Sequence, residues 1–124
     1  MNRALQTTNL TDRPESRRTL GSVQLDARLI APIVAAITAH KPVRRIWLYG
    51  SRAAGVARAA SDVDLAIEAD NWSDSDTNLA HDRLESEVPT ALKFDLVNVN
   101  AVTKPRFRES IQRHGKVIYE SADA

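Results

Sequence analysis

Two aspartates separated by one residue, Asp62 and Asp64, form the pair in this sequence whose spacing best suits chemistry. If they lie on a strand, the pleat sends both carboxylates to one face and Val63 to the other. Two parallel carboxylates repel each other, so they need either solvation or a hard cation such as Mg²⁺ between them. Two such ions about 3.5–4 Å apart can clamp the attacking and leaving oxygens of a phosphoryl-type transfer. The pair therefore indicates a candidate site for metal-assisted transfer.

A glycine–serine pair, Gly50–Ser51, directly follows the apolar run 43–49. After a buried strand, such a pair offers backbone N–H groups and a hydroxyl at the opening of a helix, where an anionic phosphate is favoured. Strand-to-helix turns also use Gly and Ser for purely steric reasons. The pair is consistent with either a phosphate site or a simple turn.

A third carboxylate, Asp95, interrupts the strand predicted over residues 92–99. An isolated carboxylate is costly to bury unless a cation pairs with it, so the alternative is an exposed position on an edge strand. If this strand lies beside the Asp62 strand, three carboxylates converge. Asp95 then completes a metal shell or accepts a proton from an incoming hydroxyl.

The same two-aspartate spacing recurs in Asp74-Ser75-Asp76 and provides an internal comparison. This second pair lies among polar residues at a predicted helix start, where carboxylates cap free N–H groups and interact favourably with the helix dipole. Spacing alone therefore does not identify a metal site.

The elements that must position these residues alternate between helix and strand. Apolar residues recur every four positions from Leu25 to Ile37 and predict a first helix, interrupted or kinked by Pro32, that ends near residues 40–42. Later helices are predicted over part of 51–60, from Ser73 or Asp74 to Pro89, and over 104–114. Gly115 is expected to take the left-handed conformation after the last of them.

Strands are predicted over residues 43–49, 62–68 and 92–99, with an edge strand over 117–119. In the second strand, Val63, Leu65 and Ile67 face the core, and the opposite side is polar. The order of elements predicts a small α/β sandwich in which helices cover one face of a sheet.

Length and composition exclude several classes of protein. The 124 residues suit one domain that buries roughly two-thirds of its unfolded surface. With 17 Lys and Arg against 16 Asp and Glu, the net charge of +1 makes long nucleic acid an unexpected partner. The chain has no cysteine, which excludes disulfides, a thiol nucleophile and thiolate zinc sites. No membrane span or secretory signal is recognised, so a cytoplasmic protein is expected.

The chain is expected to be organised around one domain. Residues 1–20 are polar and are interpreted as a mobile arm, either a solvated terminus or a segment that docks on a partner. The predicted domain covers residues 21–120, and residues 121–124 form a tail.

The combined pattern resembles the DNA polymerase β-like nucleotidyltransferase superfamily. It consists of Gly50–Ser51, ten intervening residues, the string 61–65 (Ser-Asp-Val-Asp-Leu) and the later Asp95. The small size resembles the minimal nucleotidyltransferases, the MntA-type antitoxins encoded beside HEPN-domain toxins. The resemblance covers residues 42–119. It implies an α/β (α+β) nucleotidyltransferase fold, with a mixed β-sheet and helices packed mainly on one face.

The resemblance also implies a function and a set of site residues. AMP would be moved from ATP, with two Mg²⁺ ions, to a tyrosine hydroxyl of a partner HEPN ribonuclease toxin, which is thereby neutralised. Gly50, Ser51 and Arg52 would bind the nucleotide, whereas Asp62, Asp64 and Asp95 would be the catalytic, metal-binding carboxylates. Two alternatives stay open: an antitoxin that acts by stoichiometric binding, and a nucleotidyltransferase of small molecules, which the short chain disfavours.

One departure from the family pattern concerns the phosphate-binding cation. Many relatives carry a basic residue before the second glycine of the turn, where this chain has Ala54 before Gly55. Arg52, Arg58 and Lys93 are candidate replacements, although surface roles suit each of them as well.

Three aromatic residues lie outside the motif. Trp72 lies in a polar loop and is equally consistent with a ligand contact or with packing over the sheet edge. Tyr49 and Tyr119 end strands and are given no special role.

Overall fold

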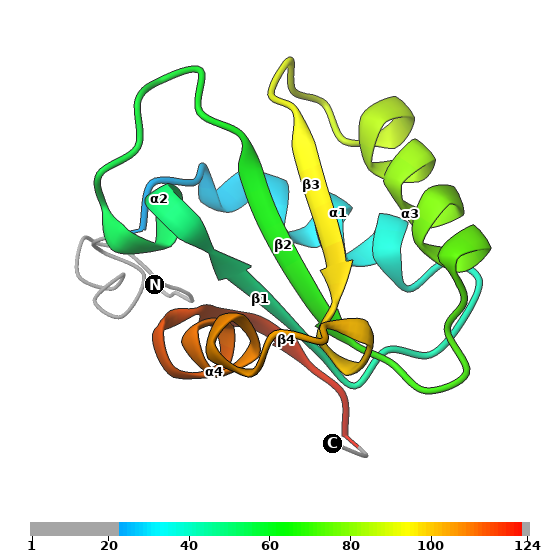
Figure 1. Ribbon diagram of the computed structural model, residues 1–124. Helices are drawn as coiled ribbons and strands as arrows, with labels where there is room; N and C mark the ends of the chain where they lie inside the picture. The colour runs from blue at the N-terminus through cyan, green and yellow to red at the C-terminus, as the bar shows by residue number, and fades with distance from the viewer. Residues whose placement is uncertain (1–22, 123–124) are drawn as a thin grey trace.

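A four-stranded mixed sheet forms the centre of the computed structural model, which describes residues 23–122 (Figure 1). The strands stand in the order β3-β2-β1-β4. Strand β1 is antiparallel to both β2 and β4, and β2 is parallel to β3. Their bounds are β1 Arg45–Tyr49, β2 Val63–Glu68, β3 Phe94–Asn98 and β4 Lys116–Glu120. The structure confirms the mixed sheet, and β4 is an edge strand as predicted.

One face of the sheet carries the main hydrophobic core. The side chains of Val63, Leu65 and Ile67 alternate toward this face, as the sequence predicts, and are fully buried. Helices α1 (Ile30–Ile37) and α3 (Asp74–Glu87) cover them and pack against each other. Two of the longer helices thus lie on one face, which agrees with the expected fold.

The opposite face is partly covered by α4 (Pro105–His114), which lies in front of the sheet in Figure 1. A smaller buried cluster joins Ile111 of α4 to Trp47 of β1 and Ala66 of β2, together with Val99 of the short helix η3 (Val99–Ala101). This side of β2 was expected to be simply polar. It is apolar where α4 packs and polar beyond the end of that helix.

The parallel pairing of β2 and β3 requires a crossover, which α3 supplies. Ser73 is the N-cap of this helix, and Asp76 completes a capping box by accepting a hydrogen bond from the Ser73 backbone N–H at 2.8 Å. Asp76 also accepts a hydrogen bond from Lys41 Nζ at 2.8 Å. Asp76 of the second aspartate pair therefore caps a helix, as the polar surroundings indicated, and ties it to the segment that follows α1.

Two predictions about helix ends are wrong. The first helix begins with η2 (Ala27–Leu29) rather than at Leu25, and Pro32 does not interrupt it but lies in the first turn of α1, where no N–H donor is needed. Gly115 has φ −65° and ψ 156°, so it is extended rather than left-handed. A Cβ at Gly115 would stand 2.5 Å from the carbonyl oxygen of Ile111 and 3.2 Å from the Trp47 side chain, which gives the glycine a packing reason.

The predicted arm over residues 1–20 and the last residues of the predicted tail lie outside the described residues. Within residues 23–122, no helix is both long and apolar enough to cross a membrane.

Candidate active site

Three neighbouring strands bring Tyr49, Asp64 and Asp95 into one row. The register pairs Tyr49 of β1 with Asp64 of β2, and Asp64 with Asp95 of β3. Residues directly opposite each other on adjacent strands project to the same face. The predicted neighbourhood of the Asp62 and Asp95 strands is therefore present, and the row lies on the face that α4 leaves partly open.

Asp64 is the most enclosed of the three carboxylates and has the clearest electrostatic signature. Burial raises its pKa above the ordinary value of 3.8, and the negative charges of Asp95 and Asp62 raise it further. The positive charge of Arg52 acts in the opposite direction. Asp62, just before β2, and Asp95 are both exposed. The three acids thus stand close enough to repel one another, which is what a cation would relieve.

The turn into α2 (Gly50–Ala54) lies in direct contact with Asp64. Gly50 has φ +73°, a left-handed conformation that favours glycine. A Cβ on Gly50 would overlap Oδ2 of Asp64. Gly50 therefore has two reasons to be glycine, and the second places the turn in contact with the carboxylate. The expected proximity of the Gly50–Ser51 turn and the aspartates is observed.

The first turn of α2 leaves its donors available. Tyr49 occupies the N-cap position and makes no side-chain capping bond. The Ser51 hydroxyl is half-buried and has no hydrogen-bond partner among residues 23–122. Helix starts without a cap carry unpaired backbone N–H groups, which suit an anionic oxygen. The turn thus has the donors that the phosphate interpretation requires.

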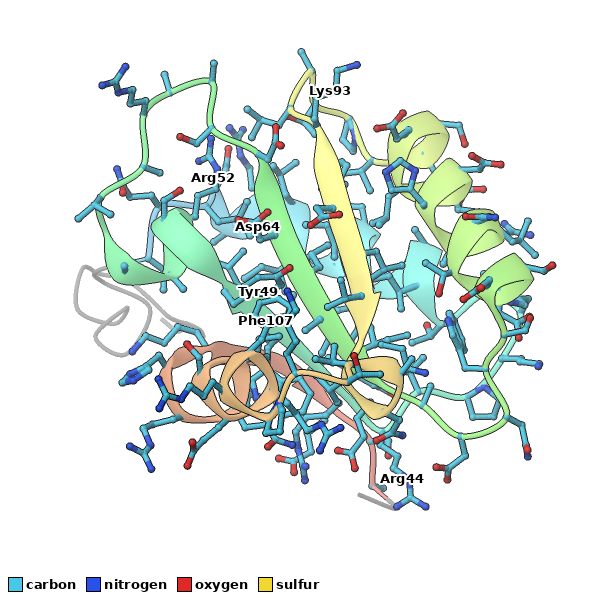
Figure 2. All side chains as sticks on the ribbon, in the orientation of Figure 1. Arg44, Tyr49, Arg52, Asp64, Lys93 and Phe107 are labelled. Carbon is cyan, nitrogen blue, oxygen red and sulfur yellow. The ribbon has the colours of Figure 1, made fainter. Side chains whose placement is uncertain are left out.

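Arg52, which was expected to bind the nucleotide, instead makes hydrogen bonds within the protein. Arg52 is 7% exposed, and its guanidinium donates hydrogen bonds to backbone carbonyls: Nη1 to Gln24 at 2.6 Å, Nη2 to Ala59 at 3.0 Å, and Nε and Nη2 to Ser61 at 3.1 and 2.9 Å. These bonds tie the loop before β2 to the segment before η2. They argue against direct nucleotide binding by Arg52, which lies near Asp64 in Figure 2 and whose charge lowers the pKa of that carboxyl.

Tyr49 is the site residue that sequence reasoning missed. Burial raises the pKa of its hydroxyl, and the charges of Asp95 and Asp64 raise it further, so the group stays protonated and can donate. Phe107 of α4 stands edge-on to the Tyr49 ring, with centroids 5.8 Å apart (Figure 2). A signal was available, because Tyr49 alternates with the core residues Ile46 and Leu48 and so had to face away from the core.

The remaining candidates lie outside this row. The side chains of Arg58 and Lys93 are exposed, on the loop before β2 and at the start of β3. Trp72 packs on His40 with ring centroids 5.2 Å apart and donates its indole N–H to Thr77 Oγ1 at 2.9 Å. Packing is therefore the role of Trp72 in this fold.

The donor set suits a hard divalent cation, because all three side chains are carboxylates and the row holds neither sulfur nor imidazole. In the part of the chain that the structure describes, no group of three acidic or histidine side chains is already drawn together into a metal-binding cluster. The carboxylates are therefore adjacent in register, and a cation would have to draw their oxygens together.

Comparisons with known proteins agree with this geometry. The family described as Polymerase beta, Nucleotidyltransferase matches residues 32–124. A relative from Haemophilus influenzae, named "Probable protein adenylyltransferase MntA", is 39% identical over 82 residues, which cover 64% of this chain and 68% of the relative.

Solved structures share the fold at lower identity. A toxin–antitoxin crystal structure with AMP-PNP matches with a TM-score of 0.59 at 23% identity, covering 76% of this chain and 75% of the other. A crystal structure of the toxin–antitoxin MntA-HepT matches with a TM-score of 0.58 at 18% identity, covering 79% and 75%. These likenesses establish the fold of the chain.

Proposed function

This chain belongs to the polymerase β nucleotidyltransferase family, and from that premise we propose that it is an antitoxin-type protein adenylyltransferase. It moves AMP from ATP to a tyrosine hydroxyl of a partner HEPN-type toxin and so neutralises the partner. The domain that does this covers residues 21–120, in the cytoplasm. The similarity to MntA supports the choice of a protein acceptor.

The observation that carries the proposal is the contact between the Gly50 turn and the carboxylate row. Gly50 leaves no room for a Cβ beside Asp64, and Asp64 is paired in register with Asp95. A phosphate held by the turn would thereby stand next to the carboxylates that would hold the metal and accept the proton of the attacking hydroxyl. Proximity of this kind is a large part of the catalytic effect in phosphoryl-type transfer.

The residues divide the reaction between them. Asp62 and Asp64 would hold Mg²⁺, with Asp95 as a third carboxylate. When bound, the metal neutralises the charge that develops on the phosphate oxygens. The N–H groups of the Gly50–Ser51 turn and the Ser51 hydroxyl bind the triphosphate.

The acceptor oxygen attacks the α-phosphorus, a new P–O bond forms, and the bond to the bridging oxygen breaks so that pyrophosphate leaves. Asp95 accepts the proton of the hydroxyl. The raised pKa of Tyr49 keeps its hydroxyl protonated, so Tyr49 does not compete with Asp95 as a base.

The test uses the full chain with ATP, Mg²⁺ and the protein encoded beside it, and the readout is the mass of that protein. We expect the mass to rise by one or more AMP groups. Replacing both Asp62 and Asp64 with Asn should abolish the shift. The matched control changes Asp74 to Asn, an exposed aspartate of the second pair, and should leave transfer intact.

Two outcomes would contradict the proposal. A tight complex with an unshifted partner would favour neutralisation by stoichiometric binding. Transfer that survives the double substitution would remove the metal and catalytic assignment of Asp62 and Asp64.

A further inference from the structure

Gln24, in the segment before η2, makes four hydrogen bonds to α2 and to the loop over residues 55–61. Its backbone N–H donates to the carbonyl of Arg52 at 2.9 Å, and its own carbonyl accepts from Arg52 Nη1 at 2.6 Å. Its side-chain amide makes the other two bonds, both to Ala57. Nε2 donates to the Ala57 carbonyl at 3.0 Å, and Oε1 accepts from the Ala57 backbone N–H at 2.5 Å. We call these four bonds the Gln24 clamp.

Arg52 carries the contact from the Gln24 clamp toward the carboxylates. Two donors of its guanidinium, Nε and Nη2, bond to the carbonyl of Ser61 at 3.1 and 2.9 Å. Ser61 is also bonded twice to Arg58: its N–H donates to the Arg58 carbonyl at 3.0 Å, and its hydroxyl accepts from the Arg58 N–H at 2.9 Å. The residue immediately before Asp62 is therefore held through its N–H, its hydroxyl and its carbonyl.

Asp62 stands between two anchored residues. On its other side, the backbone N–H of Val63 donates to the carbonyl of Lys93 at 2.8 Å, where the parallel pairing of β2 and β3 begins. Asp62 precedes the first residue of β2 and is exposed, so burial in a core does not hold its side chain. The placement of Asp62 thus depends on the backbone of its two neighbours, one of which is bonded to Arg52.

The Gln24 clamp comes from outside the part of the chain that matches the family. The match begins at residue 32, whereas Gln24 precedes η2 and lies 28 residues from Arg52 along the chain. The Ala57 backbone presents one donor and one acceptor to the side chain at position 24. A primary amide can satisfy both at once, which gives position 24 a specific reason to be glutamine.

We propose that Gln24 is a positioning residue for the metal ligand Asp62. The Gln24 clamp acts through Arg52 and Ser61, and it keeps Asp62 in the place from which this carboxylate and Asp64 bind the metal ion. The guanidinium of Arg52 also lies near Asp64 (Figure 2). The proposal rests on the proposed nucleotidyltransferase function, because that function assigns the metal to these carboxylates. The segment before η2 is then part of the catalytic unit, although none of its groups touches the substrate.

The test measures metal binding directly, with Mn²⁺ as the probe and no nucleotide present. Free Mn²⁺ gives an electron paramagnetic resonance signal that weakens when the ion binds, so a titration of the full chain yields an affinity. Gln24→Ala should weaken Mn²⁺ binding about tenfold, the low end of what loss of a supporting contact behind a metal ligand costs, because two residues intervene. The variant keeps both backbone bonds of the Gln24 clamp, so it is expected to fold.

Two further variants separate positioning from general stability. Gln24→Glu keeps an acceptor for the Ala57 N–H but has no donor for its carbonyl at pH 7, so it should also weaken Mn²⁺ binding. The matched control, Thr77→Val, removes the acceptor of the Trp72 indole N–H, a 2.9 Å hydrogen bond in the first turn of α3, beyond the far end of β2 from the carboxylates. It should lower the unfolding midpoint at least as much as Gln24→Ala and leave Mn²⁺ affinity unchanged.

Unchanged Mn²⁺ affinity in Gln24→Ala would overturn the proposal. An equal loss of affinity in Thr77→Val would reveal a general effect of stability and would overturn it as well, as would a wild-type chain that binds no Mn²⁺. A wild-type chain whose Mn²⁺ binding depends on Gln24, but which transfers no AMP to the neighbouring protein, would refute the proposed function and leave the positioning role of Gln24 standing.

Discussion

Gly50 and Asp64 are in direct contact, because the hydrogen that stands in place of a side chain on Gly50 faces Oδ2 of Asp64. The contact joins the two parts of the motif, the turn after β1 and the carboxylate on β2. Because β1 and β2 pair antiparallel at this point, neither partner can shift without disturbing the sheet. The distance between the Gly50 turn and the Asp64 carboxylate is thereby set mainly by the backbone, and a phosphate bound by the turn would stand at that distance.

Gly50→Ala should abolish AMP transfer and lower the free energy of unfolding by about 1–3 kcal/mol, because it adds both a clash with Asp64 and strain at positive φ. Gly55→Ala is the matched control. Gly55 has φ +78° but ends α2 away from the carboxylates, so its substitution should lower stability similarly while transfer persists. Urea unfolding and the mass of the modified partner measure the two effects. Full activity in Gly50→Ala would show that the contact does not constrain the site.

Arg52→Met should destabilise the protein by about 3 kcal/mol, because it leaves the carbonyls of Gln24, Ala59 and Ser61 without their charged donor. The loop over residues 55–61 should also become a site of limited proteolysis. Arg58→Met removes an exposed cation from the same loop and should change neither property. A wild-type unfolding midpoint in Arg52→Met would contradict the structural role of Arg52.

Asp64→Asn should raise the midpoint of unfolding at pH 7 in the presence of a chelator, although it abolishes transfer. Burial and the neighbouring acids raise the pKa of Asp64 in the folded state above its unfolded value of 3.8. A raised carboxylate pKa destabilises the folded state once the pH exceeds the unfolded pKa, and the penalty is complete above the folded pKa.

The advantage of Asp64→Asn should therefore shrink to nothing at about pH 3, where both states of Asp64 are protonated. Mg²⁺ should stabilise the wild type more than the variant. If the variant unfolds earlier than the wild type at pH 7 without metal, the repulsion among the carboxylates is not the dominant effect.

Asp76→Asn should lower the free energy of unfolding without changing AMP transfer. Hydrogen bonds from Lys41 and from the Ser73 backbone N–H lower the pKa of Asp76 below its ordinary value of 3.8. A lowered carboxylate pKa stabilises the folded state above the unfolded pKa, and that contribution is lost as the pH falls through the folded pKa. The difference between wild type and variant should be full at pH 7 and decline below about pH 4.

Urea titrations over this pH range measure the effect, and Asp74→Asn, which makes none of these contacts, is the comparison. A constant difference down to pH 2 would mean that capping geometry rather than charge is responsible.

The sequence predicted the carboxylate row because a local alternation pattern is enough to place Asp64 on the outer face of its strand. Alternation of Val63, Leu65 and Ile67 fixes a strand and its inner face, and Asp64 must then point outward. Asp95 could be placed beside it only on the assumption that the two strands pair, which the structure confirms.

The failures have a common cause in long-range contacts. The carbonyls that hold Arg52 come partly from Gln24, which is 28 residues away along the chain. Alternation alone places Tyr49 on the outer face of the sheet, but its position beside Asp64 and Asp95 depends on the register of three strands. Local patterns carry no information on such contacts.

The parallel pairing of β2 with β3 also sets the order in which the parts of the site form during folding. The turn at Gly50 and Asp64 meet through a short antiparallel connection, whereas Asp95 joins them only after the whole crossover through α3 has closed. Non-local parallel pairing forms slowly, because loop entropy is lost before contacts are gained. A chain that has emerged only as far as α3 lacks Asp95, the proposed proton acceptor, whether or not the turn and Asp64 have already met. The complete site is therefore expected to form only late in folding.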